Sequence, residues 1–535
     1  MKISFYGATR EVTGSCHGIE INGKRVLVDC GLRQGADNGF GQSFPFHAGE
    51  IDHVIVTHAH IDHSGRLPLL VKEGFKGSIF ATAPTCKLLE IMLRDSAHIQ
   101  ELESGWKNRK LKRAGAEAPQ ALYTLADAER VFPMLVPCHY EEYVDICDGM
   151  RIRFVDAGHL LGSAYVEMWL TENGRAKKVV FSGDIGAPDH PMICDPGQVN
   201  EADVVIMEST YANKSRPAAF DTVTQLAKVI DATLSNGGNV ICPAFAIGRT
   251  QDILYHIREI KERGLVKRCP DFPVYLDSPL ATAATKVFSG DLAGYLDEEA
   301  LALIRAGVQP LSFDGLHFVE TVEESKLLND DRTPKVIISS SGMCDAGRVR
   351  HHLKHNLWRK ECAVVFTGYQ AIGTLGRILV DESAPLVNLF GEQIAIRCGI
   401  HNFRSLSSHA DKEDLYKWIA GFKKLPERVY IVHGEEEVCS MFATRLIELG
   451  HNAIAPKYTA AYDLLTGETI FAGRDFIRRA EGEHIAAPRE SAVYQRLMQA
   501  GLRLSEIIKR NHGGPNKDLA KFADQINDLA NKWDK

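Results

Sequence analysis

Short apolar runs separated by turns dominate the first third of the chain, and most of them end in a polar residue, often Asp, Glu or His. The runs are rich in β-branched and aromatic residues, which is typical of β-strands. They read KISFYGA, RVLVDCG, DHVIVTH, RIRFVDAGH, KVVFSGD and DVVIMES. Between them, residues 84–104 repeat apolar positions at three- and four-residue spacing, which predicts a helix. We therefore expect a layered α/β structure whose strand-end loops carry the functional residues.

From about residue 208 the pattern changes to alternating helices and strands, which is typical of a parallel sheet. Helix-like FDTVTQLAKVIDATLSNGG and GRTQDILYHI alternate with strand-like NVICPAF, FPVYLDS, KVIISSSG and AVVFTGYQ. The strand-and-histidine pattern returns after residue 396, in SLSSHADKEDL and RVYIVHGEEE. A domain that stops and resumes implies an insertion. We predict a first domain part at 1–207, an inserted domain at 208–395, a second part at 396–475, and a helical extension of unknown role at 476–535.

Composition narrows the class of protein. A chain of 535 residues is long enough for several domains, and its formal charge of −7 argues against a broad electrostatic coating of nucleic acid. No secretory signal and no membrane-spanning apolar run is visible, and twelve cysteines without a CxxC pair favour reduced thiols. We expect a cytoplasmic protein without a membrane partner.

Potential metal ligands crowd the stretch VIVTHAHIDHSGRLP at residues 54–68. His58, His60, Asp62 and His63 directly follow a strand-like run, and neutral imidazole and carboxylate suit zinc. Imidazoles two residues apart can converge on one ion, while the Asp–His pair faces a second. A merely polar loop would explain a lone HxH, but it explains the full HxHxDH poorly.

The other half of such a site should come from later strand ends. VDAGHLLGSA offers His159 and VVFSGDIGAPDH offers Asp184, each flanked by glycines that let the backbone crowd a metal centre. VLVDCG places Asp29 at an earlier strand end, where it could orient a ligand imidazole or be an ordinary turn residue.

In order and in strand-end context, these motifs resemble those of the metallo-β-lactamase superfamily. MESTYANKSR, AFAIGRTQDIL, SLSSHADK and YIVHGEEE are similar to motifs of its β-CASP nuclease branch, which includes the endonuclease subunit of the cleavage and polyadenylation specificity factor and bacterial relatives. The resemblance covers about residues 1–475. It implies a metallo-β-lactamase αββα sandwich interrupted by an inserted β-CASP parallel α/β domain.

The resemblance also implies two zinc ions per chain and assigns their ligands. One ion would bind His58, His60, His159 and Asp184, and the other would bind Asp62, His63, the bridging Asp184 and His433. The implied catalytic residues are Asp62, Glu208, His409 and Asp29, with His409 as general acid and Glu208 orienting it. A structural histidine and a helix N-cap are the alternatives for His409 and Glu208. Histidine at position 433 favours RNA, because the DNA cross-link-repair branch carries valine there.

Contacts with RNA are expected away from the metals. Ser341 and Gly342 lie in SSSGM after a strand, where small residues can form an anion nest or an ordinary turn. Arg249 and Arg377 could contact the RNA backbone or serve structure. Basic runs with a Trp at 106–113 and 348–360 suit single-stranded RNA, although such runs are often only solvated faces.

The sequence therefore predicts a zinc-dependent ribonuclease acting on single-stranded RNA. A DNA-directed β-CASP nuclease and a small-molecule hydrolase that opens thioesters or lactones stay as alternatives. An inactive scaffold subunit is disfavoured because every expected ligand is present. Endonucleolytic cutting and 5′-to-3′ trimming share one metal site, so the sequence leaves the mode open, together with the RNA, the pathway, and a homodimer or RNA-processing partner.

Overall fold

The computed structural model describes residues 1–34, 41–113, 121–215, 221–290, 292–368, 370, 373–403 and 407–475, and parts of 496–533. The chain divides into two units, Met1–Ser43 with Ala48–Arg478, and Phe44–His47 with Arg479–Lys535. None of the described helices has both the length and the apolar composition needed to cross a bilayer.

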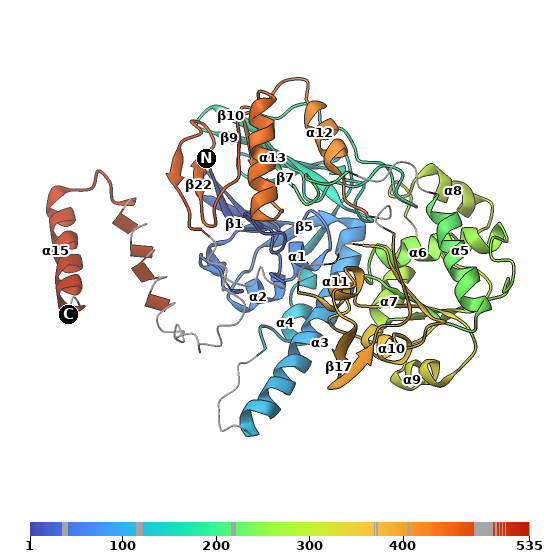
Figure 1. The fold of residues 1–535 in the computed structure, drawn as a ribbon. Helices are drawn as coiled ribbons and strands as arrows, with labels where there is room; N and C mark the ends of the chain where they lie inside the picture. Colours follow the sequence, from blue (N-terminus) through green and yellow to red (C-terminus); the bar gives the residue numbers. More distant parts are fainter. Residues whose placement is uncertain are drawn as a thin grey trace. The chain divides into compact units, whose positions relative to one another are not determined.

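Two large sheets form the first architectural element of the larger unit (Figure 1). The first sheet has the order β23-β22-β1-β2-β3-β4-β5-β6 and the second has the order β21-β20-β11-β10-β9-β8-β7. The first contains β1 (Lys2–Gly7), β2 (Cys16–Ile21), β3 (Lys24–Val28), β4 (His53–Ile55), β5 (Ser78–Thr82), β6 (Leu135–Cys138), β22 (Ala461–Asp463) and β23 (Thr469–Phe471). The second contains β7 (Tyr143–Cys147), β8 (Met150–Asp156), β9 (Ala164–Glu172), β10 (Arg175–Phe181), β11 (Val204–Met207), β20 (Arg428–Ile431) and β21 (Ala453–Ile454).

The main core lies between these sheets. Phe5 and Val26 from the first sheet share one buried cluster with Phe154, Val166 and Phe181 from the second. Apolar side chains on the facing sides of two sheets bury each other, which excludes water from both. This packing makes the two sheets a sandwich.

Helices cover the outer faces of the sandwich. On the second sheet, α12 (Lys412–Ala420) and α13 (Glu436–Glu448) bury Leu415, Trp418 and Phe442 in a second core cluster. On the first sheet, α3 (Ala83–Arg113) contacts β5 and β6. The shorter α1 (Ile61–Ser64), α2 (Leu67–Lys72), α4 (Leu125–Glu129), η2 (Ala48–Glu50) and η3 (Phe132–Met134) complete this part of the chain. The predicted helix–sheet–sheet–helix sandwich is confirmed.

A third, fully parallel sheet is inserted between two neighbouring strands of the sandwich. Strands β11 and β20 pair in parallel, with Met207 opposite Ile431, so the chain leaves the second sheet at one strand and returns at its neighbour. The third sheet has the order β14-β13-β15-β12-β16-β19. Its strands are β12 (Val240–Pro243), β13 (Val274–Asp277), β14 (Leu316–Phe318), β15 (Val336–Ser339), β16 (Ala363–Phe366) and β19 (Gly399–Asn402).

Helices and one hairpin complete the inserted part. They are α5 (Thr222–Ser235), α6 (Arg249–Glu262), α7 (Pro279–Phe288), α8 (Glu298–Arg305), α9 (Val322–Asp330), α10 (Val349–Asn356), α11 (Leu375–Val380), β17 (Leu386–Leu389) and β18 (Glu392–Ala395). The inserted parallel α/β domain predicted from the sequence is confirmed as an architecture. Its last strand, β19, follows residue 395, and the predicted domain boundaries themselves stay a prediction.

Side-chain caps decide where several helices begin. Asp221 accepts the Thr224 backbone N–H at the start of α5, and Asp411 accepts the Asp414 N–H at the start of α12. Such a cap satisfies a backbone donor that the first turn of a helix leaves open. The α12 cap ends the loop that carries His409.

The smaller unit contains the C-terminal helix α15 (Asn516–Trp533). The described positions between residues 496 and 510 are also helical. Gly513, with φ of +87°, lies in the break between the two helical segments. These described positions are helical, and the extension predicted at 476–535 stays a prediction as a whole.

Glycines let the backbones of two strand-end loops approach each other closely. A Cβ added to Gly186 would lie 1.9 Å from the carbonyl oxygen of Gly158, between the loops that carry Asp184 and His159. We expect Gly186→Ala to lower the free energy of unfolding by about 1–3 kcal/mol, because the backbone must shift to relieve the overlap.

Thermal and denaturant unfolding would measure this change. The control is Gly105→Ala in α3, where an added Cβ meets no atom within 4 Å and stability should stay the same or rise slightly. Equal stability of the Gly186→Ala variant and the unaltered protein would contradict the close approach of the two loops.

Candidate metal centre

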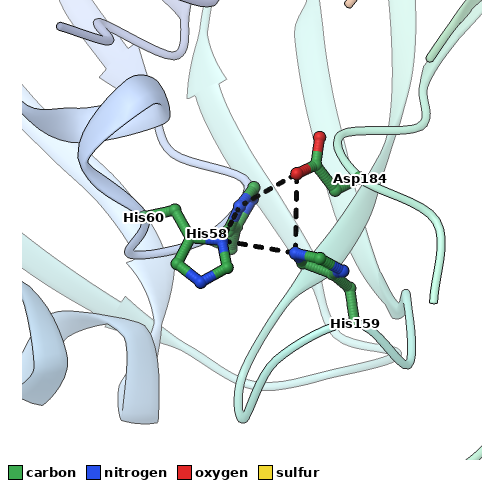
Figure 2. Close-up of side chains that lie close together, drawn as sticks. All are labelled: His58, His60, His159 and Asp184. Carbon is green, nitrogen blue, oxygen red and sulfur yellow. Dashed lines mark hydrogen bonds and ion pairs between the residues drawn. The ribbon is translucent and has the colours of Figure 1, made fainter. Parts of the chain in front are cut away.

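Three histidines and one carboxylate from three strand ends converge on one point, as Figure 2 shows. His58 and His60 follow β4, His159 follows β8, and Asp184 follows β10. His60 Nδ1 lies 3.1 Å from His58 Nε2 and 3.3 Å from His159 Nε2. Asp184 Oδ2 lies 3.6 Å from His58 Nε2 and 3.5 Å from His159 Nε2. The sequence prediction grouped the same four residues.

A second group meets the other oxygen of Asp184. Its Oδ1 lies 3.2 Å from His63 Nε2 and 3.5 Å from His433 Nε2. The two imidazole nitrogens are 3.0 Å apart, and Asp62 Oδ2 lies 3.6 Å from His433 Nε2. Asp184 therefore presents one carboxylate oxygen to each group.

The ligand atoms of each group are arranged to bind a metal ion rather than to hydrogen-bond with one another. Within each group the candidate ligand atoms lie within 4.8 Å of one another. Neutral imidazole nitrogens at such distances direct lone pairs at one another, and the buried Asp184 Oδ1 lacks a hydrogen bond of good geometry among the described residues. A cation in each group would satisfy these acceptors, and nitrogen and carboxylate oxygen are zinc-type ligands.

In four of the histidines, one ring nitrogen faces the ligand group and the other, Nδ1, faces away from it. Each of these four Nδ1 atoms has a polar partner. The pairs are His63 Nδ1 with Asp29 Oδ2 at 2.7 Å, His58 Nδ1 with Thr57 Oγ1 at 3.1 Å, His433 Nδ1 with Thr210 Oγ1 at 2.9 Å, and His159 Nδ1 with the Ser408 carbonyl oxygen at 3.3 Å. Such partners select the tautomer and hold the ring, so that the other nitrogen is available to a metal.

Two of these supporting residues escaped the sequence analysis. Thr57 directly precedes His58 and also donates its hydroxyl to Asp29, and Thr210 lies two residues after Glu208. Their positions next to predicted site residues were a visible signal, but threonine is too common to single out. Asp29 lies where the sequence prediction expected a residue that orients a ligand.

Two site residues adopt backbone conformations that are rare for side chains with a Cβ. Asp29 has φ of +62° at the end of β3, and His433 has φ of +51° at the end of β20. A left-handed residue of this kind costs of order 1–3 kcal/mol and persists where the surroundings hold it. The resulting sharp turns aim both side chains into the site.

Burial and charge act in opposite directions on the histidines. Burial lowers the pKa values of His58 and His159 well below the usual range. Burial would also lower those of His63 and His433, but Asp184 and neighbouring carboxylates raise the pKa of His63 well above its usual value and that of His433 to about 9. The carboxylates therefore favour the protonated form of both rings, and a cation would compete with those protons for the ring nitrogens.

Glu208 and His409 meet beside the first group. Glu208 Oε1 accepts the Ile185 N–H at 2.6 Å and lies 3.5 Å from His409 Nδ1. Burial would lower the pKa of His409, but the charge and hydrogen bond of Glu208 raise it above the usual value. The His409 side chain is 21% exposed, whereas that of Asp184 is 2% exposed. The ring therefore lies at the accessible edge of the site.

The predicted phosphate loop lies on the inserted domain. Ser341 accepts the Ala346 N–H through its hydroxyl, and the Gly342 carbonyl accepts Gln370 Nε2 at 3.1 Å. A Cβ on Gly342 would come within 3.0 Å of the Phe245 backbone nitrogen. These contacts describe an ordered turn, and binding of phosphate there stays a prediction.

The two arginines predicted to contact the RNA backbone are paired with carboxylates of this chain. Arg249 is buried and donates to Asp252 Oδ2 at 2.9 Å, so an RNA phosphate would have to displace that carboxylate. Arg377 is part-exposed and pairs with Asp381. The pairing of Arg249 favours its structural alternative.

The basic run at 348–360 is also largely neutralised. Its Arg348, Lys354 and Arg359 pair with Asp277, Glu392 and Glu361, respectively. These ion pairs favour a structural role over an open RNA-binding face. The side chains of the run at 106–113 lie outside the described residues.

Comparisons with known proteins agree with this geometry. Residues 19–185 match the model of a metallo-beta-lactamase superfamily domain, 250–379 match a Beta-Casp domain, and 393–456 match a Zn-dependent metallo-hydrolase RNA specificity domain. The chain is 36% identical to Ribonuclease TTHA0252 of Thermus thermophilus, over 82% of this chain and 94% of that protein.

Two archaeal relatives are similar over a comparable length. Transcription termination factor FttA of Methanocaldococcus jannaschii is 30% identical over 83% of this chain and 68% of that protein. An RNase J-like protein of the same organism is 31% identical over 82% of this chain and 94% of that protein.

The sandwich and its strand-end cluster of histidines and aspartates define a metal-binding hydrolase of the metallo-β-lactamase fold. With the inserted parallel domain and the relatives above, the chain belongs to the β-CASP family of that superfamily.

The hydrogen bond from Asp29 to His63 generates a prediction about metal affinity. We expect Asp29→Ala to weaken metal binding roughly 10- to 100-fold, because His63 loses the partner that fixes its ring. Competition with a chelator of known affinity would measure the change. Asp145→Ala, which removes a carboxylate of an exposed ion pair, is the control and should bind metal as the unaltered protein does. Unchanged affinity in Asp29→Ala would argue against an orienting role.

Proposed function

We propose that this protein is a metal-dependent ribonuclease that hydrolyses phosphodiester bonds of single-stranded RNA. The observation that carries the proposal is the division of Asp184 between two ligand groups, with Glu208 and His409 beside them. The β-CASP relatives named as ribonucleases, and the match to an RNA specificity domain, support RNA as the substrate.

We further propose two zinc ions per chain. His58, His60, His159 and Asp184 would hold one ion, and Asp62, His63, Asp184 and His433 would hold the other. When bound, the ions would activate water for attack and neutralise charge on the phosphate. The chemistry of the donor atoms and the orphaned Asp184 Oδ1 support this assignment.

The protein's own side chains would handle the leaving group. Glu208 contacts the His409 ring at Nδ1, so the other ring nitrogen, Nε2, would be the one that meets a leaving group. A protonated His409 could donate to the leaving ribose oxygen. Glu208 also fixes the backbone at Ile185, next to Asp184, so it couples the proposed acid to the ligand loop.

The inserted domain distinguishes this reading from small-molecule hydrolysis. Opening a thioester or lactone requires neither a second α/β domain nor the Glu208–His409 pair. We propose internal cleavage of RNA as the mode, with 5′-to-3′ trimming as the competing one. We propose a cytoplasmic location, supported by the scattered cysteines without a CxxC pair.

A cleavage assay tests the function. Single-stranded RNA and its DNA counterpart, each with an internal or a 5′ label, would be incubated with the zinc-loaded protein with and without a chelator. We expect chelator-sensitive RNA fragments of defined internal length. Mononucleotides released progressively would indicate trimming, and cleavage of DNA alone would indicate the DNA-directed alternative. Failure to cleave either polymer would overturn the nuclease proposal.

His58→Ala should reduce cleavage to background and lower the bound metal, because it removes a ligand from the first group. Metal content by atomic spectroscopy and the same gel assay would measure both effects. His98→Ala, on an exposed position of α3, is the matched control and should change neither. Full activity in a metal-depleted His58→Ala variant would refute the mechanism.

His409→Ala should behave differently from a ligand variant. We expect turnover to fall by roughly 10²–10⁴-fold with the bound metal largely retained, because a general acid is lost and the ligands are not. Loss of both metal ions in this variant would show that His409 is a ligand rather than the proton donor.

A further inference from the structure

Helix α15 carries an apolar stripe that is part-exposed at Leu519, Phe522 and Ile526 and exposed at Leu529 and Trp533. Leu519, Phe522, Ile526, Leu529 and Trp533 follow one another at alternating spacings of three and four residues. Leu529 is 56% exposed and Trp533 is 74% exposed. The helix lies beyond residue 456, where the last family match ends, so the stripe lies outside the matched domains.

The spacing is that of a coiled-coil heptad. Leu519, Ile526 and Trp533 occupy the a positions, and Phe522 and Leu529 occupy the d positions. An apolar seam of this kind is stabilised when a second helix covers it, because both helices then bury surface that water would otherwise contact. The charged residues flanking the seam show which helix can do so.

We propose that α15 pairs with the α15 helix of a second copy of this chain in an antiparallel coiled coil. In that arrangement each a position faces a d position of the other helix. Leu519 would lie against Leu529 of the second copy, and Phe522 against Ile526 of the second copy, with each contact repeated by the two-fold axis. Trp533 would lie against the exposed Pro515 of the second copy.

Charge complementarity supports the second copy as the occupant. The g positions, Asp518, Gln525 and Lys532, face the g positions of the other helix in an antiparallel pair. Asp518 would therefore lie opposite Lys532 of the second copy, and the two-fold axis repeats this opposite-charge pair. The e positions on the other side of the seam are Asn516, Ala523 and Ala530, which carry no charge.

A parallel pair would not use these charges. There each g position faces the e position five residues further along the other helix, so Asp518 would face Ala523. Asp518 would then gain no charged partner, and Trp533 would meet Trp533 of the second copy. The pattern therefore favours the antiparallel arrangement.

The molar mass of the zinc-loaded protein tests the proposal. It would be measured by light scattering during size-exclusion chromatography over a series of protein concentrations. We expect a dimer that dissociates on dilution, because the seam is only one short helix long. Ile526→Asp should make the protein a monomer at every concentration, because it places two carboxylates in the seam. Nuclease activity per chain should stay unchanged in this variant, which shows that the larger unit is folded.

Charge reversal tests the orientation. Asp518→Lys alone and Lys532→Asp alone should each weaken the dimer by roughly tenfold, because each creates two like-charge contacts. The double variant Asp518→Lys with Lys532→Asp should restore the original dissociation constant. A single reversal that has no effect, or a double variant as weak as the single ones, would overturn the antiparallel pairing.

The remaining outcomes are equally decisive. A protein that is a monomer at every concentration would overturn the proposal and indicate that the stripe serves another occupant. A dimer that persists in Ile526→Asp would place the interface elsewhere. Loss of nuclease activity would bear on the proposed function and not on the pairing, because the two are measured separately.

Discussion

The carboxylate of Asp184 is buried between two groups of histidines, and the remainder of the site is arranged around that constraint. A buried charge is costly unless it is paired, and Asp184 meets four imidazole nitrogens that come from three different strand ends. Burial tends to neutralise those rings, whereas the carboxylate tends to charge them. Cations held by these nitrogens and oxygens would resolve the conflict, which would explain why donors that otherwise repel one another converge.

The sandwich makes such convergence possible because its strands end at one edge. Met207 lies opposite Ile431 in neighbouring parallel strands, so Glu208 and His433 leave the sheet together although 224 residues separate them in sequence. The inserted domain occupies that interval without disturbing the pairing, because the chain leaves and returns at adjacent strands. An additional domain can therefore face a metal centre at little cost to the sheet that holds it.

Much of this organisation was predictable from local pattern. The strand-like runs, the helix after residue 83, the alternation in the inserted domain and six of the seven proposed metal ligands lie in segments with clear signals, whereas His433 was assigned by resemblance to the family. The arginines were harder. The partner of Arg249 lies three residues away and was visible, whereas Arg348 pairs with Asp277, far along the chain. A basic run therefore suggests an RNA-binding surface in the sequence even when carboxylates from distant segments pair with it in the folded chain.

The sequence by itself determined the main strands and helices, the insertion and most of the residue types of the site, because period, turn chemistry and ligand spacing are local properties, and its resemblance to a known family supplied the sandwich. Only the tertiary structure decided that each oxygen of Asp184 faces a different histidine group, and that Thr57 and Thr210 hold ligand rings. It also decided the left-handed turns at Asp29 and His433. These features depend on distances between segments far apart in the chain, and those distances are set by how the sheets pack.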